Sequence, residues 1–91
     1  MSDKTRLLSR KADLEAIRRA NLDRARDLRD SARRYRADRD RPSNPTRAYE
    51  HQRECDQKGA EAERQADRSD REAENVLNEI RGLERAIRDA S

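Results

Sequence analysis

Residues 41–45 of this 91-residue chain read RPSNP and contain both of its prolines. Proline disfavours the helical conformation in the residue before it, so Pro42 ends a preceding helix. Asn44 is a favourable N-cap residue, and Pro45 suits the first helical position, where its missing N–H is not needed. The predicted elements are a helix over about 3–40, a turn over 41–45 and a second helix over about 46–89.

The composition favours long helices over a globular domain. Leu, Ile, Val and Phe total 11 residues, too few for an ordinary globular core, whereas Ala, Glu, Lys, Leu and Arg total 52. A majority of those five residue types is typical of coiled coils and long helices. Charged residues form 47% of the chain, yet acidic and basic groups nearly cancel to a net charge of +3. We therefore predict an all-α protein, and the composition argues against a conventional enzyme domain.

Apolar and small residues recur every seven positions in both predicted helices, which indicates two helices packed along a seam, the rows of residues at their interface. The first helix has one row of Leu7, Leu14, Asn21, Leu28 and Tyr35, with Ile17, Ala25 and Ala32 in adjacent rows. The second helix has the rows Gln52, Gly59, Ala66, Ala73, Ile80, Ile87 and Ala48, Cys55, Ala62, Ser69, Val76, Leu83, Ala90. Because the turn is short, the expected fold is an antiparallel helical hairpin, a single domain over residues 1–91.

The position of the turn predicts which residues face each other across the seam. Folding about Ser43 and Asn44 pairs residue i with residue 87 − i, which sets Leu28 opposite Gly59 and Ala32 opposite Cys55. Asn21 in a seam row either fixes the register of the helices or is simply solvated.

A two-helix hairpin buries one stripe per helix, and the few large side chains here hardly offset the entropy of ordering the chain. Leu8, Leu22 and Leu77 lie outside the main seam rows and suit a second interface. We therefore expect a four-helix bundle, formed by homodimerisation or by docking onto a helical protein partner. The predicted self-association or partner interface comprises Leu7, Leu8, Leu14, Ile17, Val76, Leu77, Ile80, Leu83 and Ile87.

Basic side chains concentrate near the turn and form a candidate target-contact surface. Its residues are Arg33, Arg34, Arg36, Arg39, Arg41 and Arg47. Guanidinium groups suit carboxylates and phosphates, so an acidic protein groove and nucleic acid are both candidate targets. A solvated face is the other interpretation, because Asp38 and Asp40 dilute the charge. The chain has no Trp or Phe and two Tyr, which leaves little for base stacking.

His51 and Cys55 lie one helical turn apart and could supply two metal ligands, but two ligands are half a site. Cys55 also falls in a seam row, where a small buried thiol is ordinary. The carboxylates lie on exposed faces that give no reason for a raised pKa. The sequence therefore predicts no metal, no cofactor, no catalytic residue and no small-molecule substrate.

No run of ten apolar residues occurs, so we expect no membrane span, no signal-peptide core and a cytoplasmic location. The leading hypothesis is a non-enzymatic protein-protein interaction module, acting as an adaptor, assembly factor or inhibitor that presents its Arg-rich turn to a macromolecule. The second hypothesis is a nucleic-acid-binding helical bundle that uses the arginines of the first helix and the turn.

The turn Pro42-Ser43-Asn44-Pro45 between two helices resembles the Pro-x-x-Pro turn of type III secretion needle subunits, with Gln52 as a further matching position. This resemblance implies a third hypothesis, a filament or secretion-apparatus subunit. It covers only the turn, and needle subunits polymerise through more apolar faces than this chain offers. The hairpin architecture is also similar to small plasmid-encoded RNA-binding hairpins that dimerise into four-helix bundles, at the level of fold alone.

Overall fold

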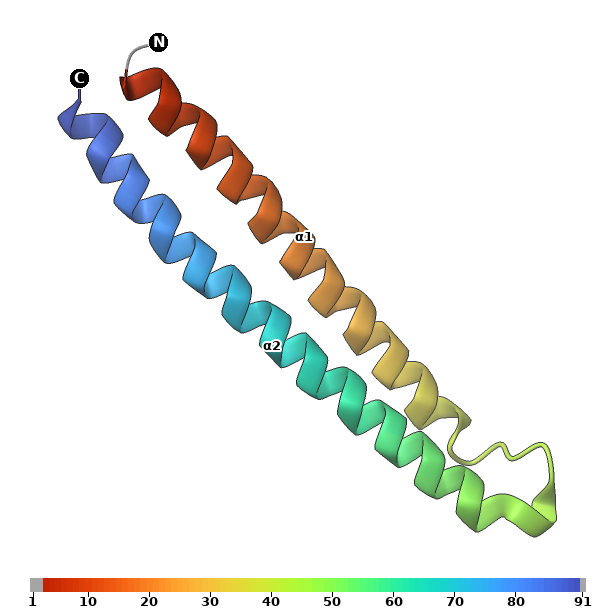
Figure 1. Cartoon of the computed structure of the whole chain (residues 1–91). Helices are drawn as coiled ribbons and strands as arrows, with labels where there is room; N and C mark the ends of the chain where they lie inside the picture. Colours follow the sequence, from red (N-terminus) through yellow and green to blue (C-terminus); the bar gives the residue numbers. More distant parts are fainter. Residues whose placement is uncertain (1–2, 91) are drawn as a thin grey trace. The chain divides into compact units, whose positions relative to one another are not determined.

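The computed structural model describes residues 3–90 and contains, over that range, two long helices and no strand (Figure 1). Helix α1 spans Asp3–Asp38, the short 3-10 helix η1 spans Pro45–Arg47, and α2 spans Ala48–Asp89. The predicted all-α fold of two helices joined by a short turn is therefore confirmed. Helix α1 ends before Arg39 because the next N–H groups bond three residues back, from Arg39 to the Arg36 carbonyl and from Arg41 to the Asp38 carbonyl.

Asn44 and Pro45 start the second helical segment as their residue types predict. The Asn44 side-chain oxygen accepts hydrogen bonds from the Thr46 backbone N–H at 3.1 Å and from the Thr46 hydroxyl at 2.7 Å. The Arg47 N–H bonds to the Asn44 carbonyl at 3.0 Å. These bonds satisfy donors that the start of a helix leaves without partners.

Contacts divide the chain into two units, each of which is described by itself. The turn unit is Arg24–Arg68, and the terminal unit comprises the chain up to Asp23 and from Ser69 onward. Within each unit, a segment of α1 lies antiparallel to a segment of α2 (Figure 1). Helix packing is therefore the basis of both cores.

The core of the turn unit is built from small side chains. Its buried residues are Ala25, Ala32, Cys55, Gly59, Ala62 and Ala66. A Cβ atom on Gly59 would lie 3.7 Å from the Ala32 carbonyl oxygen and 3.8 Å from the Tyr35 Cβ. The two helices therefore approach closely here, as small seam residues allow.

The expected pairing of Leu28 with Gly59 and of Ala32 with Cys55 is wrong. Tyr35, which the fold-back rule places opposite Gln52, instead faces Gly59, seven residues further along α2. The pairing shifts because α2 begins to face α1 only near His51, whose Nε2 lies 2.5 Å from the carbonyl of Asp38 at the end of α1. The 3-10 helix η1 and the first residues of α2 therefore extend beyond the end of α1. Because the shift is one heptad, the same rows of α2 face α1 as predicted. The buried residues of α2 therefore lie in the predicted rows, although their partners on α1 differ.

The core of the terminal unit contains larger side chains. Leu14 and Ile80 are 3% and 4% exposed, and Ser69 and Ala73 are also buried. Around them, five large aliphatic side chains are half-buried: Leu7, Val76, Leu77, Leu83 and Ile87. Most of the large aliphatic residues of the chain thus lie in this unit.

Ile17 does not fill the seam of α1, contrary to expectation, because 45% of it is exposed. A seam alternates steps of four and three residues, so the residue that follows Leu14 in the seam is Arg18, before Asn21. Arg18 and Asn21 are both half-buried, and the Asn21 Nδ2 donates to the Ile17 carbonyl at 3.2 Å. The amide of Asn21 is thus satisfied by its own helix.

Candidate interaction site

All nine residues of the predicted interface lie in the terminal unit, four on α1 and five on α2. They differ in burial: Leu14 and Ile80 form the core, whereas Leu8 and Ile17 are 46% and 45% exposed. Leu22, predicted to lie outside the seam, is 39% exposed, and Leu77 is half-buried. The terminal unit therefore carries large apolar side chains that its own two helices do not cover.

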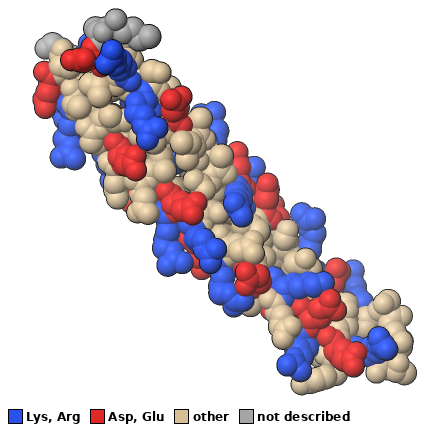
Figure 2. Space-filling model, viewed as in Figure 1, with Lys and Arg blue, Asp and Glu red and all other residues tan. Residues whose placement is uncertain are grey.

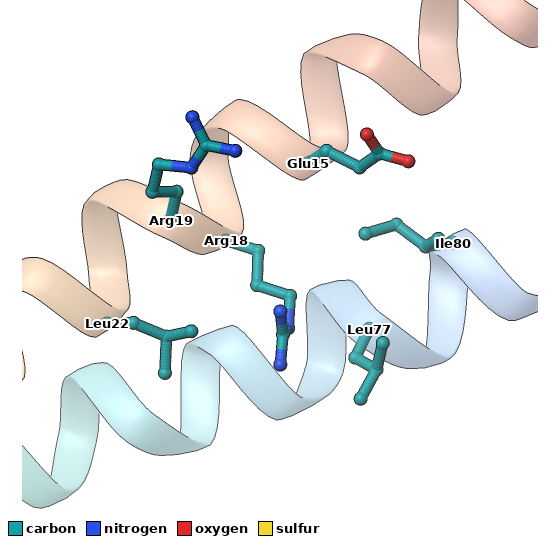
Figure 3. A pocket seen from close by; sticks show the side chains of 6 residues that line it. All are labelled: Glu15, Arg18, Arg19, Leu22, Leu77 and Ile80. Atoms are coloured by element: carbon teal, nitrogen blue, oxygen red, sulfur yellow. The ribbon is translucent and has the colours of Figure 1, made fainter.

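Leu22 and Leu77 line one hollow between α1 and α2 of this unit, with a volume of about 340 Å³. The other lining residues are Glu15, Arg18, Arg19 and Ile80 (Figure 3). We call this hollow the Arg18 groove. Figure 3 shows the Arg18 side chain reaching from α1 across to α2, with its guanidinium between Leu22 and Leu77. The groove thus combines an apolar lining with a cation.

The Nε of Arg18 is buried and has no hydrogen-bond acceptor, the one such side-chain atom within residues 3–90. A buried donor without an acceptor costs about 1–3 kcal/mol. Sequence reasoning missed Arg18 because it placed the apolar Ile17 in the seam. The alternating steps of four and three residues through Asn21, Ala25, Leu28 and Ala32 were the signal that could have found it, because the step before Asn21 falls on Arg18.

The candidate surface at the turn is partly occupied by ion pairs. Arg33 pairs with Asp30, Arg36 pairs with Glu63, and the Arg39 Nε donates to Asp56 at 2.8 Å. The other three arginines, Arg34, Arg41 and Arg47, are exposed. Three of the six predicted arginines are therefore paired with carboxylates of the same chain.

Opposite charges are intermixed on the face of the molecule shown in Figure 2, where Lys and Arg alternate with Asp and Glu. Exposed pairs at helical spacing contribute to this pattern, such as Lys58 with Glu54 at 2.8 Å. Each exposed pair of this kind contributes little to stability. The visible face is not a continuous basic patch of the kind that favours nucleic acid.

His51 and Cys55 adjoin each other, with the Sγ 3.6 Å from the His51 Nε2. Cys55 is buried in the seam, and the same imidazole nitrogen lies against the Asp38 carbonyl. No group of three or more His, Cys, Asp or Glu side chains placed to hold a metal occurs in the described part of the chain. Cys55 therefore packs in the seam, and His51 contacts the carbonyl of the last residue of α1.

The resolved carboxyl pKa shifts are downward. A hydrogen bond from Lys58 and its positive charge lower the pKa of Glu54, and hydrogen bonds from Arg64 and Gln65 lower that of Glu61. Glu54 in turn raises the pKa of Lys58. These shifts stabilise the charged forms, which is typical of solvated ion pairs rather than of a general acid.

No protein-family model, curated protein or solved structure matches this sequence. Neither helix contains a stretch, within residues 3–90, that is long and apolar enough to cross a membrane. The site must therefore be interpreted from its own residues.

Proposed function

We propose that this chain is a cytoplasmic, non-enzymatic protein-interaction module that self-associates through its terminal unit to form a four-helix bundle. The observation that carries this proposal is the location of the large exposed apolar side chains. Three of the four, Leu8, Ile17 and Leu22, lie on α1 of the terminal unit, and the fourth is Tyr49. Leu8 and Leu22, fourteen residues apart, project from the same side of α1, and exposed apolar side chains on one side of a helix are characteristic of association surfaces.

The accessible surface of the chain supports the same proposal. It amounts to 6991 Å², whereas a globular monomer of 10.7 kDa exposes about 5,500 Å². The excess of about 1,500 Å² is in the range that each protomer of an obligate homodimer buries, which is roughly 1,000–2,500 Å². A second hairpin has the helices needed to cover a surface of this size.

Self-association leaves the turn free to present its arginines to an acidic protein target. Arg34, Arg41 and Arg47 are the exposed arginines that this target would contact, since an incoming acidic group would have to displace the carboxylates already paired with Arg33, Arg36 and Arg39. Nucleic-acid binding would instead appear as an affinity that falls steeply with salt. A filament subunit would give polymers that lengthen with concentration.

The test replaces Leu8 and Leu22 together with serine. We expect the variant to dissociate at concentrations where the unchanged chain is dimeric, because each leucine contributes about 1 kcal/mol or more of apolar burial. Sedimentation equilibrium measures the mass. The matched control is Ala16→Ser with Ala20→Ser, at exposed positions of the same helix. An unchanged dimer in the leucine variant would contradict the proposal.

A further inference from the structure

Two hollows on the surface are each lined by three arginines spaced four and three residues apart. The turn triad, in a hollow of about 310 Å³ in the turn unit, consists of Arg29, Arg33 and Arg36 on α1. The terminal triad, in a hollow of about 580 Å³ in the terminal unit, consists of Arg81, Arg85 and Arg88 on α2. Residues at this spacing are neighbours on one face of a helix, so each triad groups three positive charges.

The turn triad is neutralised by carboxylates of its own unit. Arg29 Nη2 lies 3.1 Å from Asp67 Oδ1, and Arg36 pairs with Glu63. The third arginine of the triad pairs with Asp30 of its own helix. Glu63 and Asp67 both line the hollow and lie one turn apart on α2. The turn unit therefore shows what three arginines at this spacing hold: carboxylates on one face of a neighbouring helix.

The terminal triad lacks such carboxylates in the described part of its unit. Glu84 lines the hollow, but its Oε1 lies 4.0 Å from the Lys11 ammonium of α1. The three arginines are exposed, and none of them makes an ion pair or a hydrogen bond within residues 3–90. Even when Glu84 is counted, the lining carries two uncompensated positive charges. Because like charges one turn apart repel each other, an anion that enters the hollow is stabilising.

An acidic helix matches the terminal triad better than nucleic acid does. Guanidinium groups bind both carboxylates and phosphates. In the turn unit, two of the three anions are carboxylates spaced one turn apart on a helix. The described lining of the terminal hollow contains no aromatic ring on which a base could stack. The anions that this arginine spacing holds are therefore those of an acidic helix.

We propose that the terminal triad is the docking site for an acidic helical segment of a partner protein. The segment presents two carboxylates one helical turn apart, and these take the place at Arg81, Arg85 and Arg88 that Glu63 and Asp67 have at the turn triad. This docking is independent of the proposed self-association, because the arginines lie on α2 whereas the exposed leucines tested above lie on α1.

The experiment measures the binding of a fluorescent, alanine-rich helical peptide that carries two glutamates four residues apart. Fluorescence anisotropy at low salt compares the unchanged chain with the variant Arg81→Gln, Arg85→Gln, Arg88→Gln. We expect this variant to bind the peptide at least about tenfold more weakly, because it loses the charge-assisted hydrogen bonds. Glutamine is a good helix former, so the variant should keep its helicity, which circular dichroism checks.

The matched control variant is Arg6→Gln with Arg10→Gln and Arg71→Gln. These three arginines are exposed in the same unit, and their replacement changes the net charge by the same amount. We expect the control to bind the peptide like the unchanged chain. A loss of binding as large as that of the triad variant would overturn the proposal, because net charge alone would then attract the peptide.

A second peptide, with its two glutamates only two residues apart, tests the spacing on the unchanged chain and so does not depend on how a variant folds. Its glutamates project from different sides of the helix, and we expect about tenfold weaker binding. Equal binding of the two peptides would overturn the proposal, because the triad would not recognise the helical spacing.

An oligothymidylate serves as the phosphate probe. If it binds more tightly than the first peptide and loses its binding in the triad variant, the site takes a phosphate backbone and the proposal is overturned. If the first peptide does not bind at all, the docking site is refuted, whereas the mass of the unchanged chain still decides the proposed self-association.

Discussion

The turn unit and the terminal unit share one heptad pattern but fill their seams with side chains of different size. In the turn unit, small residues fill the seam and ion pairs join the two helices, such as Arg29 with Asp67 at 3.1 Å. In the terminal unit, Leu14 and Ile80 fill the seam, and Leu22 occupies a flanking position. The difference teaches that two helices cover a seam of small residues completely, whereas the terminal unit leaves leucines exposed beside its seam.

The largest expected effect comes from placing charge in the core of the terminal unit. Ile80→Asp with Leu83→Asp buries carboxylates among aliphatic side chains and should cost more than about 3 kcal/mol of folding free energy. Because small domains are marginally stable, we expect loss of both helicity and dimer. Circular dichroism and sedimentation measure these losses.

The matched control for that variant is Asn75→Asp with Asn78→Asp, at exposed positions of the same segment with the same change in charge. We expect it to fold normally. If the Ile80 and Leu83 variant kept its helicity and mass, the terminal unit would not be the part that holds the protein together.

A smaller, stabilising effect is expected at the two glycines, one in each unit. A Cβ on Gly82 of the terminal unit meets nothing within 4 Å, so Gly82→Ala should raise stability by about 1 kcal/mol through helix propensity. At Gly59 the added Cβ makes ordinary contacts at 3.7 and 3.8 Å, and we expect a similar gain. Thermal unfolding measures both. A destabilised Gly59→Ala would show that the turn unit needs glycine for its close approach.

The smallest effect concerns pH and belongs to the turn unit. Lys58 lowers the pKa of Glu54 below 4.5, so this pair stabilises the folded state above pH 4.5, and its contribution is lost as the pH falls through the lowered pKa. The raised pKa of Lys58 has the opposite sign: its contribution is present below pH 10.5 and is lost as the pH rises through the raised pKa.

Lys58→Gln should therefore weaken the response of helicity to acid, measured by circular dichroism between pH 5 and 2, relative to the unchanged chain. Asn78→Gln, in the terminal unit, serves as the control and should respond like the unchanged chain. An acid titration of Lys58→Gln identical to that of the unchanged chain would contradict this assignment.

The sequence predicted the elements well because Pro42, Asn44 and Pro45 act locally on the backbone. It predicted the seam rows of α2 because their heptad spacing is regular. The register was wrong by a heptad because it depends on how far η1 and the first turn of α2 extend beyond α1, which is a property of the folded loop. Arg18 was missed because its burial follows from spacing, whereas its charge suggests solvent.

The measurement that tests the central claim most directly is sedimentation equilibrium of the unchanged chain with circular dichroism over a concentration series. The account predicts a helical species of twice the 10.7 kDa chain mass, whose helicity decreases as dilution separates the copies. A fully helical monomer at every concentration would contradict it, because the exposed leucines of the terminal unit would then need no partner.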